Sequence, residues 1–341
     1  MTSIVLYKLP SEKIYRKLVH DEKPQLFSNL KQLDGKEGFV IAPFIVSKSC
    51  PIVLLRNNQV CIREIDNYKS NDSNSAFSPS LSIGRKEYSA DFRRFHAELQ
   101  SGNFDKLVLS RSINIPINSQ LSLENFFLEA CRLYPQLFVA CFDTPATGAW
   151  LMATPELLLG KSKNLWHTMA LAGTMGHDTT QWSKKNKLEQ KHVAEYIRSC
   201  LKEHAINIDE SSPYSVKAGH LQHLQTDFNF TLSNNNHLGT LLDSLHPTPA
   251  VCGLPKSEAL KFIAANEHNN REYYSGFAGR LSVNGETDIY VSLRCMKIYS
   301  NHATLFAGGG LINQSSEENE WRETEAKLQT MARLIVTHNY V

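Results

Sequence analysis

The chain has 341 residues, of which 42% are hydrophobic, and its 36 Lys+Arg against 34 Asp+Glu give a formal net charge of +2. This is the composition of a soluble globular protein, and it argues against a strongly basic nucleic-acid-binding surface and against a membrane-spanning run of about 18 apolar residues. The seven cysteines are odd in number and form no C-x-x-C pair. They therefore predict neither a disulfide framework nor a zinc site, and they favour a reducing, cytoplasmic location.

The apolar pattern predicts strands and helices in mixed order. Near the N-terminus, residues 39–46 and 52–55 are strand-like, whereas 67–80 are polar and typical of a surface loop. The other predicted elements are helices at 89–101, 121–134, 184–204, 257–265 and 317–337 and strands at 104–113, 137–142, 149–153, within 211–234, and at 275–283, 288–299 and 303–307. Because strands and helices do not alternate regularly, the order predicts one large α+β domain rather than a doubly wound parallel sheet.

Acidic residues share one face of the predicted C-terminal helix. Glu320, Glu323 and Lys327 are spaced i, i+3 and i+7, and Glu189 lies in the predicted helix at 184–204. Carboxylates without other ligand types suit Mg²⁺, which prefers oxygen. The alternative is a solvated Glu323–Lys327 pair that stabilises the helix by about 0.3–0.5 kcal/mol. Spacing alone favours this alternative.

Two loop-like segments could hold a ligand by their backbones. Residues 306–311 are rich in glycine and follow a strand, so their N–H groups could bind a carboxylate or phosphate, or simply form a tight turn. They do not match G-x-G-x-x-G, which argues against a dinucleotide site. Residues 245–255 contain three prolines and predict a stiff, extended segment that either faces a ligand or connects two elements.

Charged residues interrupt predicted apolar strands at two places. Lys106 and Arg294 lie within strand-like runs, and Glu156 follows another. A charge inside an apolar strand usually has a partner. The alternatives are an edge-strand charge facing solvent for Arg294 and a turn carboxylate for Glu156.

The order of these motifs resembles that of the chorismate-utilising enzymes, and most closely the isochorismate synthases. The matching blocks are KLVLSR at 106–111, ATPELLL at 153–159, LAGT at 171–174, LHPTPAVCG at 245–253, YYSG at 273–276, LRC at 293–295, LFAGGG at 305–310 and EWRETEAK at 320–327. They lie in the motif-bearing part at 86–337, whereas 1–85 match only loosely. The resemblance implies a single domain over 1–341, with two large packed β-sheets, outer helices and a site in a cleft.

The resemblance also implies a role for each matched residue. Lys106 matches the general base that activates water for attack at C2 of chorismate, and Glu156 the general acid that protonates the departing C4 hydroxyl. Glu189 and Glu323 match ligands of Mg²⁺, and Glu320 an acidic neighbour in the same metal site. The implied substrate-binding residues are Gly173, Thr174, Ala250, Val251, Tyr274, Arg294, Gly308 and Lys327. A base lysine must be neutral, so we expect its pKa to fall from about 10.4, and an acid glutamate needs a raised pKa.

Two positions distinguish the implied activity within the family. Anthranilate synthases carry glutamine where this chain has Lys106, and aminodeoxychorismate synthases carry a nucleophilic lysine where it has Ala250. Water is therefore the expected nucleophile, without a glutaminase subunit, nucleic acid or membrane as partner. We expect a monomeric Mg²⁺-dependent isochorismate synthase, with menaquinone synthesis favoured over siderophore synthesis.

Two alternatives stay open. A salicylate synthase would also eliminate pyruvate, and it shares the same catalytic and metal residues. A noncatalytic chorismate-binding paralogue or subunit is suggested only by departures from the family pattern: Asn186 and Gln190 replace an Asp and a His beside Glu189. Tyr274 stands where Phe is common, and Arg280 where an aromatic residue is common. The changes beside Glu189 predict an altered surrounding of the metal site.

Overall fold

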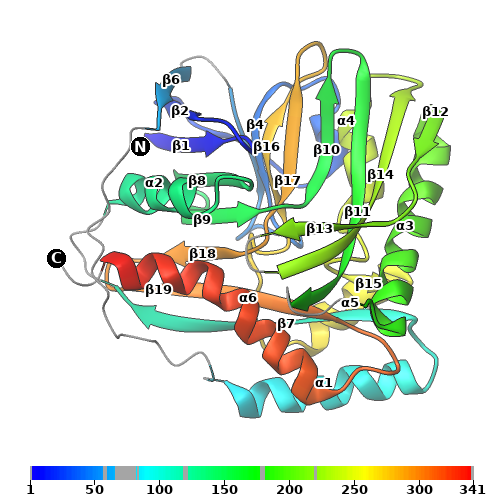
Figure 1. Ribbon diagram of the computed structural model, residues 1–341. Helices are drawn as coiled ribbons and strands as arrows, with labels where there is room; N and C mark the ends of the chain where they lie inside the picture. Colours follow the sequence, from blue (N-terminus) through cyan, green and yellow to red (C-terminus); the bar gives the residue numbers. More distant parts are fainter. Residues whose placement is uncertain are drawn as a thin grey trace.

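A computed structural model describes residues 2–56, 60–65, 82, 84–117, 122–176, 181–218 and 221–338. Two antiparallel sheets pack against each other, and helices cover their outer faces (Figure 1). The predicted α+β architecture is confirmed. The predicted loop at 67–80 lies outside the described residues.

The first sheet carries the motif-bearing strands β7 and β19 side by side. Its order is β15-β7-β19-β18-β9-β8-β1-β2-β6. Along β7 and β19 the register runs from Leu107↔Leu311 to Pro116↔His302. The strands are β1 (Ser3–Lys8), β2 (Ile14–His20), β6 (Val60–Glu64), β7 (Lys106–Pro116), β8 (Phe138–Thr144), β9 (Gly148–Thr154), β15 (Gly253–Leu254), β18 (Cys295–Ile298) and β19 (His302–Leu311).

The second sheet contains the long pair β11 and β14. Its order is β12-β14-β11-β10-β17-β16-β4-β5-β3, and β13 also pairs with β14. The strands are β3 (Gln25–Phe27), β4 (Gly38–Ala42), β5 (Ile52–Leu55), β10 (Leu157–Ser162), β11 (Leu165–Gly176), β12 (Ala205–Glu210), β13 (Tyr214–Ala218), β14 (Leu221–Leu232), β16 (Phe277–Leu281) and β17 (Thr287–Val291).

Within the described ranges, six α-helices and one short 3₁₀ helix surround the sheets. They are η1 (Leu30–Leu33), α1 (Arg85–Gln100), α2 (Leu123–Leu133), α3 (Lys184–His204), α4 (Leu238–Leu245), α5 (Lys256–Asn266) and α6 (Glu317–His338). In Figure 1, α3 (green) flanks β11 and β14, while α6 (red) crosses β19 and β7. Helix α3 has the bounds that its apolar stripe predicts.

Apolar side chains fill the space between the sheets and under the helices. Tyr7 of β1, Phe39 of β4 and Tyr290 of β17 belong to one buried cluster, which therefore lies between the two sheets. A second cluster joins Val193 and Ile197 of α3 to the second sheet. A third packs α2 and α6 on the first sheet. The two central helices of the site are thus anchored on different sheets.

Two predicted local structures are wrong. Gly308, Gly309 and Gly310 do not form a turn, because β19 continues through them and pairs with β7. The strand expected at 288–299 is interrupted: β17 ends at Val291, β18 begins at Cys295, and Arg294 lies between them with φ 46°. The break takes Arg294 out of the ladder, so its side chain is free to leave the strand plane.

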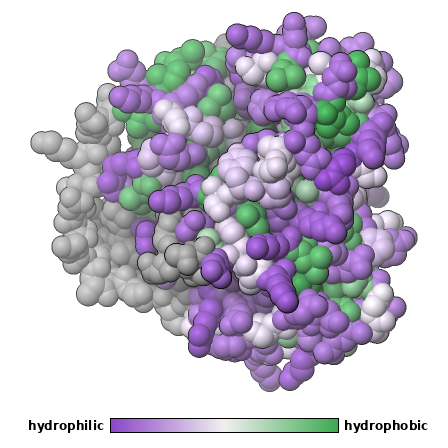
Figure 2. Space-filling view, turned by 45° about the vertical axis from the view of Figure 1, so that its right-hand side comes forward, coloured by the Kyte–Doolittle hydropathy of each residue, from purple (hydrophilic) through white to green (hydrophobic). Residues whose placement is uncertain are grey.

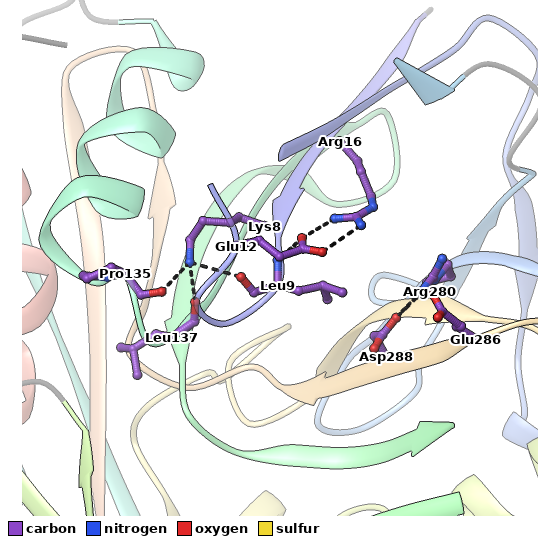
Figure 3. Close-up of polar contacts among 9 residues, drawn as sticks. All are labelled: Lys8, Leu9, Glu12, Arg16, Pro135, Leu137, Arg280, Glu286 and Asp288. Atoms are coloured by element: carbon purple, nitrogen blue, oxygen red, sulfur yellow. Dashed lines mark hydrogen bonds and ion pairs between the residues drawn. The ribbon is translucent and has the colours of Figure 1, made fainter. Parts of the chain in front are cut away.

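Figure 3 shows two polar clusters formed by the N-terminal strands and the second sheet. Lys8 is fully buried, and its Nζ donates to the carbonyls of Pro135 at 2.8 Å, Leu137 at 3.0 Å and Leu9 at 3.2 Å. Arg280 pairs with Asp288 at 2.5 Å and Glu286 at 2.7 Å. Neither Lys8 nor Arg280 is among the residues that line the cavity described next.

The face in Figure 2 is predominantly hydrophilic, with separate small hydrophobic areas. Exposed large hydrophobic residues such as Ile62 and Ile206 are distant in sequence and lie on edge strands of different sheets. Of the helices that the structure describes, none is long and apolar enough to cross a membrane.

Candidate active site

One cavity collects residues from nearly every predicted motif. It has about 630 Å³ of empty space, part of it open to solvent. All eight predicted substrate-binding residues line it: Gly173, Thr174, Ala250, Val251, Tyr274, Arg294, Gly308 and Lys327. Glu156 and Glu189 line it too, whereas Lys106 lies directly behind Glu189 and Gly310. The fold thus places residues from segments between β7 and α6, which are far apart in sequence, around this one cavity.

The glycine-rich part of β19 allows other groups to approach its backbone closely. A Cβ on Gly310 would collide with the Glu189 carboxylate and lie 2.8 Å from Lys106 Cε. A Cβ on Gly308 would lie 2.8 Å from the Tyr274 hydroxyl oxygen. The glycines are therefore needed for close packing here rather than for a turn.

Glu156 is a buried carboxyl with a raised pKa. It follows β9 and precedes β10, and it is 4% exposed. Burial raises its pKa to about 7, although the positive charges of Lys106, Arg294 and Lys327 oppose the shift. A carboxyl with this pKa is partly protonated at neutral pH, so it can donate a proton.

Lys106 and Glu189 form a buried ion pair between β7 and α3. Lys106 Nζ lies 2.9 Å from Glu189 Oε1, and Lys106 is completely buried. The ammonium makes no well-aligned hydrogen bond to the described residues. The predicted base thus lies against a predicted metal ligand and within electrostatic reach of Glu156.

The two acidic residues of α6 predicted for the metal site, Glu320 and Glu323, each have a lysine partner. Lys327 Nζ lies 2.7 Å from Glu323 Oε1 and donates to the Gly308 carbonyl at 2.8 Å. Lys185 Nζ lies 2.8 Å from Glu320 Oε1. Burial disfavours the charge on Glu323, but Lys327 and Lys185 outweigh it and lower its pKa to about 2. The Glu323–Lys327 pair does form, and it is largely buried rather than on a solvated face, with Lys327 in the cavity lining.

The site offers carboxylate oxygens, which are the ligands that Mg²⁺ prefers. Glu189, Glu320 and Glu323 offer carboxylate oxygens, and Glu320 Oε2 is buried without a hydrogen-bond partner in the described structure. Among the described residues, no three His, Cys, Asp or Glu side chains are grouped closely enough to hold a metal ion. Since Mg²⁺ commonly takes one or two protein carboxylates together with water and substrate oxygens, the residues present fit it.

His223 on β14 is a site residue that sequence reasoning missed. Arg294 Nη2 donates to His223 Nε2 at 2.8 Å, and His223 Nδ1 donates to the Gly173 carbonyl at 3.0 Å. Burial, together with the charges of Arg294 and Lys327, lowers the pKa of His223 to about 3. A neutral imidazole therefore fixes the Arg294 guanidinium. The available signal was a histidine on the buried side of an alternating strand.

A buried Arg271–Glu267 pair, also missed, links two walls of the cavity, β7 and the segment at Val251. Arg271 donates to the carbonyls of Val251 and Val108, both at 2.7 Å, and contacts Glu267 at 2.6 Å. Glu267 accepts from the Ser110 backbone N–H at 2.7 Å. The i, i+4 spacing of the pair just before the 273–276 motif was the available signal.

The two departures beside Glu189 make contacts of their own. Asn186 Nδ2 donates to the Thr174 carbonyl at 3.0 Å, and Gln190 Nε2 donates to Thr226 Oγ1 at 2.7 Å. Asn186 therefore positions the Gly173–Thr174 segment, and Gln190 joins α3 to β14.

Comparisons with a family model and with known proteins point to the same family. The model of the family described as "Chorismate binding enzyme" matches residues 35–336. Isochorismate synthase EntC of Escherichia coli K12 is 33% identical over 249 residues, covering 69% of this chain and 63% of that protein. Isochorismate synthase MenF of the same strain is 30% identical over 248 residues, covering 70% and 57%. The matched part spans less than two thirds of these relatives.

Solved structures share the fold over almost the whole chain. A putative 2,3-dihydroxybenzoate-specific isochorismate synthase, DhbC from Bacillus anthracis, superposes with a TM-score of 0.83 at 21% identity, covering 98% of this chain and 96% of that one. Anthranilate synthase component I from Streptococcus pneumoniae gives 0.69 at 16% identity, covering 98% and 92%. At these identities the likeness concerns the fold.

Proposed function

The chain belongs to the chorismate binding enzyme family, and on that basis we propose that it is an isochorismate synthase that uses Mg²⁺. It would convert chorismate to isochorismate by adding water at C2 and releasing the C4 hydroxyl as water. The similarity to enzymes named isochorismate synthase, at about 30% identity, supports this activity.

The observation that carries the proposal is that Glu156 lines one cavity together with the cations Arg294 and Lys327, while Lys106 lies just behind the Glu189 wall of the same cavity. Lys106, in its neutral amine form, would accept a proton from water as the water oxygen bonds to C2 and the ring double bonds shift. Glu156 would give its proton to the departing C4 hydroxyl, and its pKa of about 7 supports that role. Arg294 and Lys327 line the cavity and would hold the carboxylates of chorismate.

The metal would be held by Glu189 and Glu323, with Glu320 beside them. When bound, Mg²⁺ supplies a positive charge that orients and neutralises a substrate carboxylate. Gly308 and Tyr274 would border the enolpyruvyl group, and Ala250 and Val251 the ring.

The product test separates this proposal from the nearest alternative. Purified protein with chorismate and Mg²⁺ should form isochorismate, and EDTA should stop the reaction. Chromatography that finds salicylate and pyruvate would identify a salicylate synthase instead. Tight chorismate binding without turnover would identify a noncatalytic paralogue.

Substitutions of Lys106 and Glu156 test the roles of these residues as base and acid. Lys106→Ala and Glu156→Ala should each abolish turnover while circular dichroism shows an intact fold. Full activity in both variants would contradict the assigned roles.

The biological setting is part of the proposal. Relatives include enzymes named for menaquinone and for siderophore synthesis, and we favour menaquinone. A monomer without a glutaminase subunit stays the expected form. All seven cysteines are free, which supports a reducing compartment such as the cytoplasm.

A further inference from the structure

We propose that Lys185 is an internal counterion that occupies the metal site when no metal is bound and must leave for Mg²⁺ to enter. The inference rests on the proposed function only in taking Glu189, Glu320 and Glu323 as the metal-binding carboxylates. The inference predicts that Lys185 lowers the affinity of the protein for Mg²⁺ when chorismate is absent.

The position of Lys185 carries the inference. Its Nζ lies 2.8 Å from Glu320 Oε1 and 4.0 Å from Glu189 Oε2, so one ammonium lies between carboxylates of α6 and α3. Glu323 is also within its electrostatic reach. Carboxylates of α3 and α6 that face the same space repel one another at low dielectric, and an ammonium between Glu320 and Glu189 reduces that repulsion.

Of the three site lysines, Lys185 is best placed to leave. Lys106 is completely buried, and Lys327 is also bonded to the Gly308 carbonyl. The side chain of Lys185 is 19% exposed and lies in the first turn of α3. Rotation of its long side chain toward solvent would uncover Glu320 and Glu189, and Glu320 Oε2 already lacks a partner in the described structure.

The test measures Mg²⁺ binding by titration calorimetry without chorismate. Lys185→Met should bind Mg²⁺ at least tenfold more tightly than the unaltered protein. Lys187→Met, which removes the same charge from an exposed residue of the same helix, should change the affinity less than threefold. Equal effects of the two substitutions, or weaker binding by Lys185→Met, would overturn the inference.

Thermal unfolding with and without Mg²⁺ gives a second readout that is independent of calorimetry. Lys185→Met should melt at a lower temperature than the unaltered protein without Mg²⁺, and Mg²⁺ should raise its Tm more. Lys185→Arg keeps the charge and should bind Mg²⁺ no more tightly than the unaltered protein. Tight binding by Lys185→Arg would contradict displacement of a charge.

These measurements are independent of turnover. If the protein made no isochorismate but Lys185→Met bound Mg²⁺ tightly, the proposed function would fail and this inference would stand. If isochorismate formed but Lys185→Met matched Lys187→Met, this inference alone would fail.

Discussion

Lys106 Nζ lies 2.9 Å from Glu189 Oε1, in an ion pair that joins β7 of the first sheet to α3 on the second. Gly310 permits this approach, because any side chain there would collide with the Glu189 carboxylate. The pair therefore couples the proposed base to the proposed metal site, and both residues depend on the packing of the two sheets.

Breaking this pair from one side should affect both activity and stability. Lys106→Gln should abolish isochorismate formation and lower the free energy of unfolding by about 3 kcal/mol, because Glu189 keeps a buried charge. In Lys106→Gln/Glu189→Gln neither member of the pair is charged, so about 1 kcal/mol or more of the lost free energy of unfolding should be regained. Denaturant unfolding of the single and double variants measures this coupling, and strictly additive losses would contradict it.

The raised pKa of Glu156 should appear in the pH dependence of stability. Its pKa is about 7 in the folded protein against 4.5 ordinarily, so the folded state binds more protons between these values. The contribution of Glu156 to the free energy of unfolding therefore falls as the pH rises from 4.5 to 7.

Glu156→Gln removes this titration. Relative to the unaltered protein, the variant should gain roughly 3 kcal/mol between pH 4.5 and pH 8, measured by denaturant unfolding without metal. A stability difference that stays constant over this range would show that Glu156 does not titrate with a raised pKa.

His223 should act through Arg294 on substrate binding. His223→Leu removes the acceptor at 2.8 Å from the guanidinium, so KM for chorismate should rise at least tenfold, more than kcat falls. His223→Gln keeps a side-chain acceptor and should recover most of the affinity. His167→Leu, on β11 but outside the cavity lining, serves as the control. An unchanged KM in His223→Leu would contradict the positioning role.

Lys8 should stabilise the fold without affecting the site. Lys8→Met removes one donor from each of three carbonyls and should lower the free energy of unfolding by about 2–4 kcal/mol. Lys13→Met, at an exposed lysine nearby in the chain, should change it by less than about 0.5 kcal/mol. Similar losses in the two variants, or a changed KM in Lys8→Met, would contradict a local structural role.

The sequence by itself determined many of the elements and the family motifs. The apolar stripe of α3 predicted its bounds, and strands β8 and β9 followed from short apolar runs, since these patterns reflect local burial. The matched motifs also identified ten residues that line the cavity, whereas His223 was missed. Periodicity did not reveal the continuation of β19 through Gly308–Gly310 or the break at Arg294, because strand pairing and packing decide both.

Only the tertiary structure decided which charges meet. The contact of Lys185 with Glu320, the contact of Arg294 with His223, and the bonds of Arg271 to two walls of the cavity join segments distant in sequence. Local propensity carries no information about such contacts. They arise because two sheets and their helices bury charged groups together, and each buried charge then requires a partner.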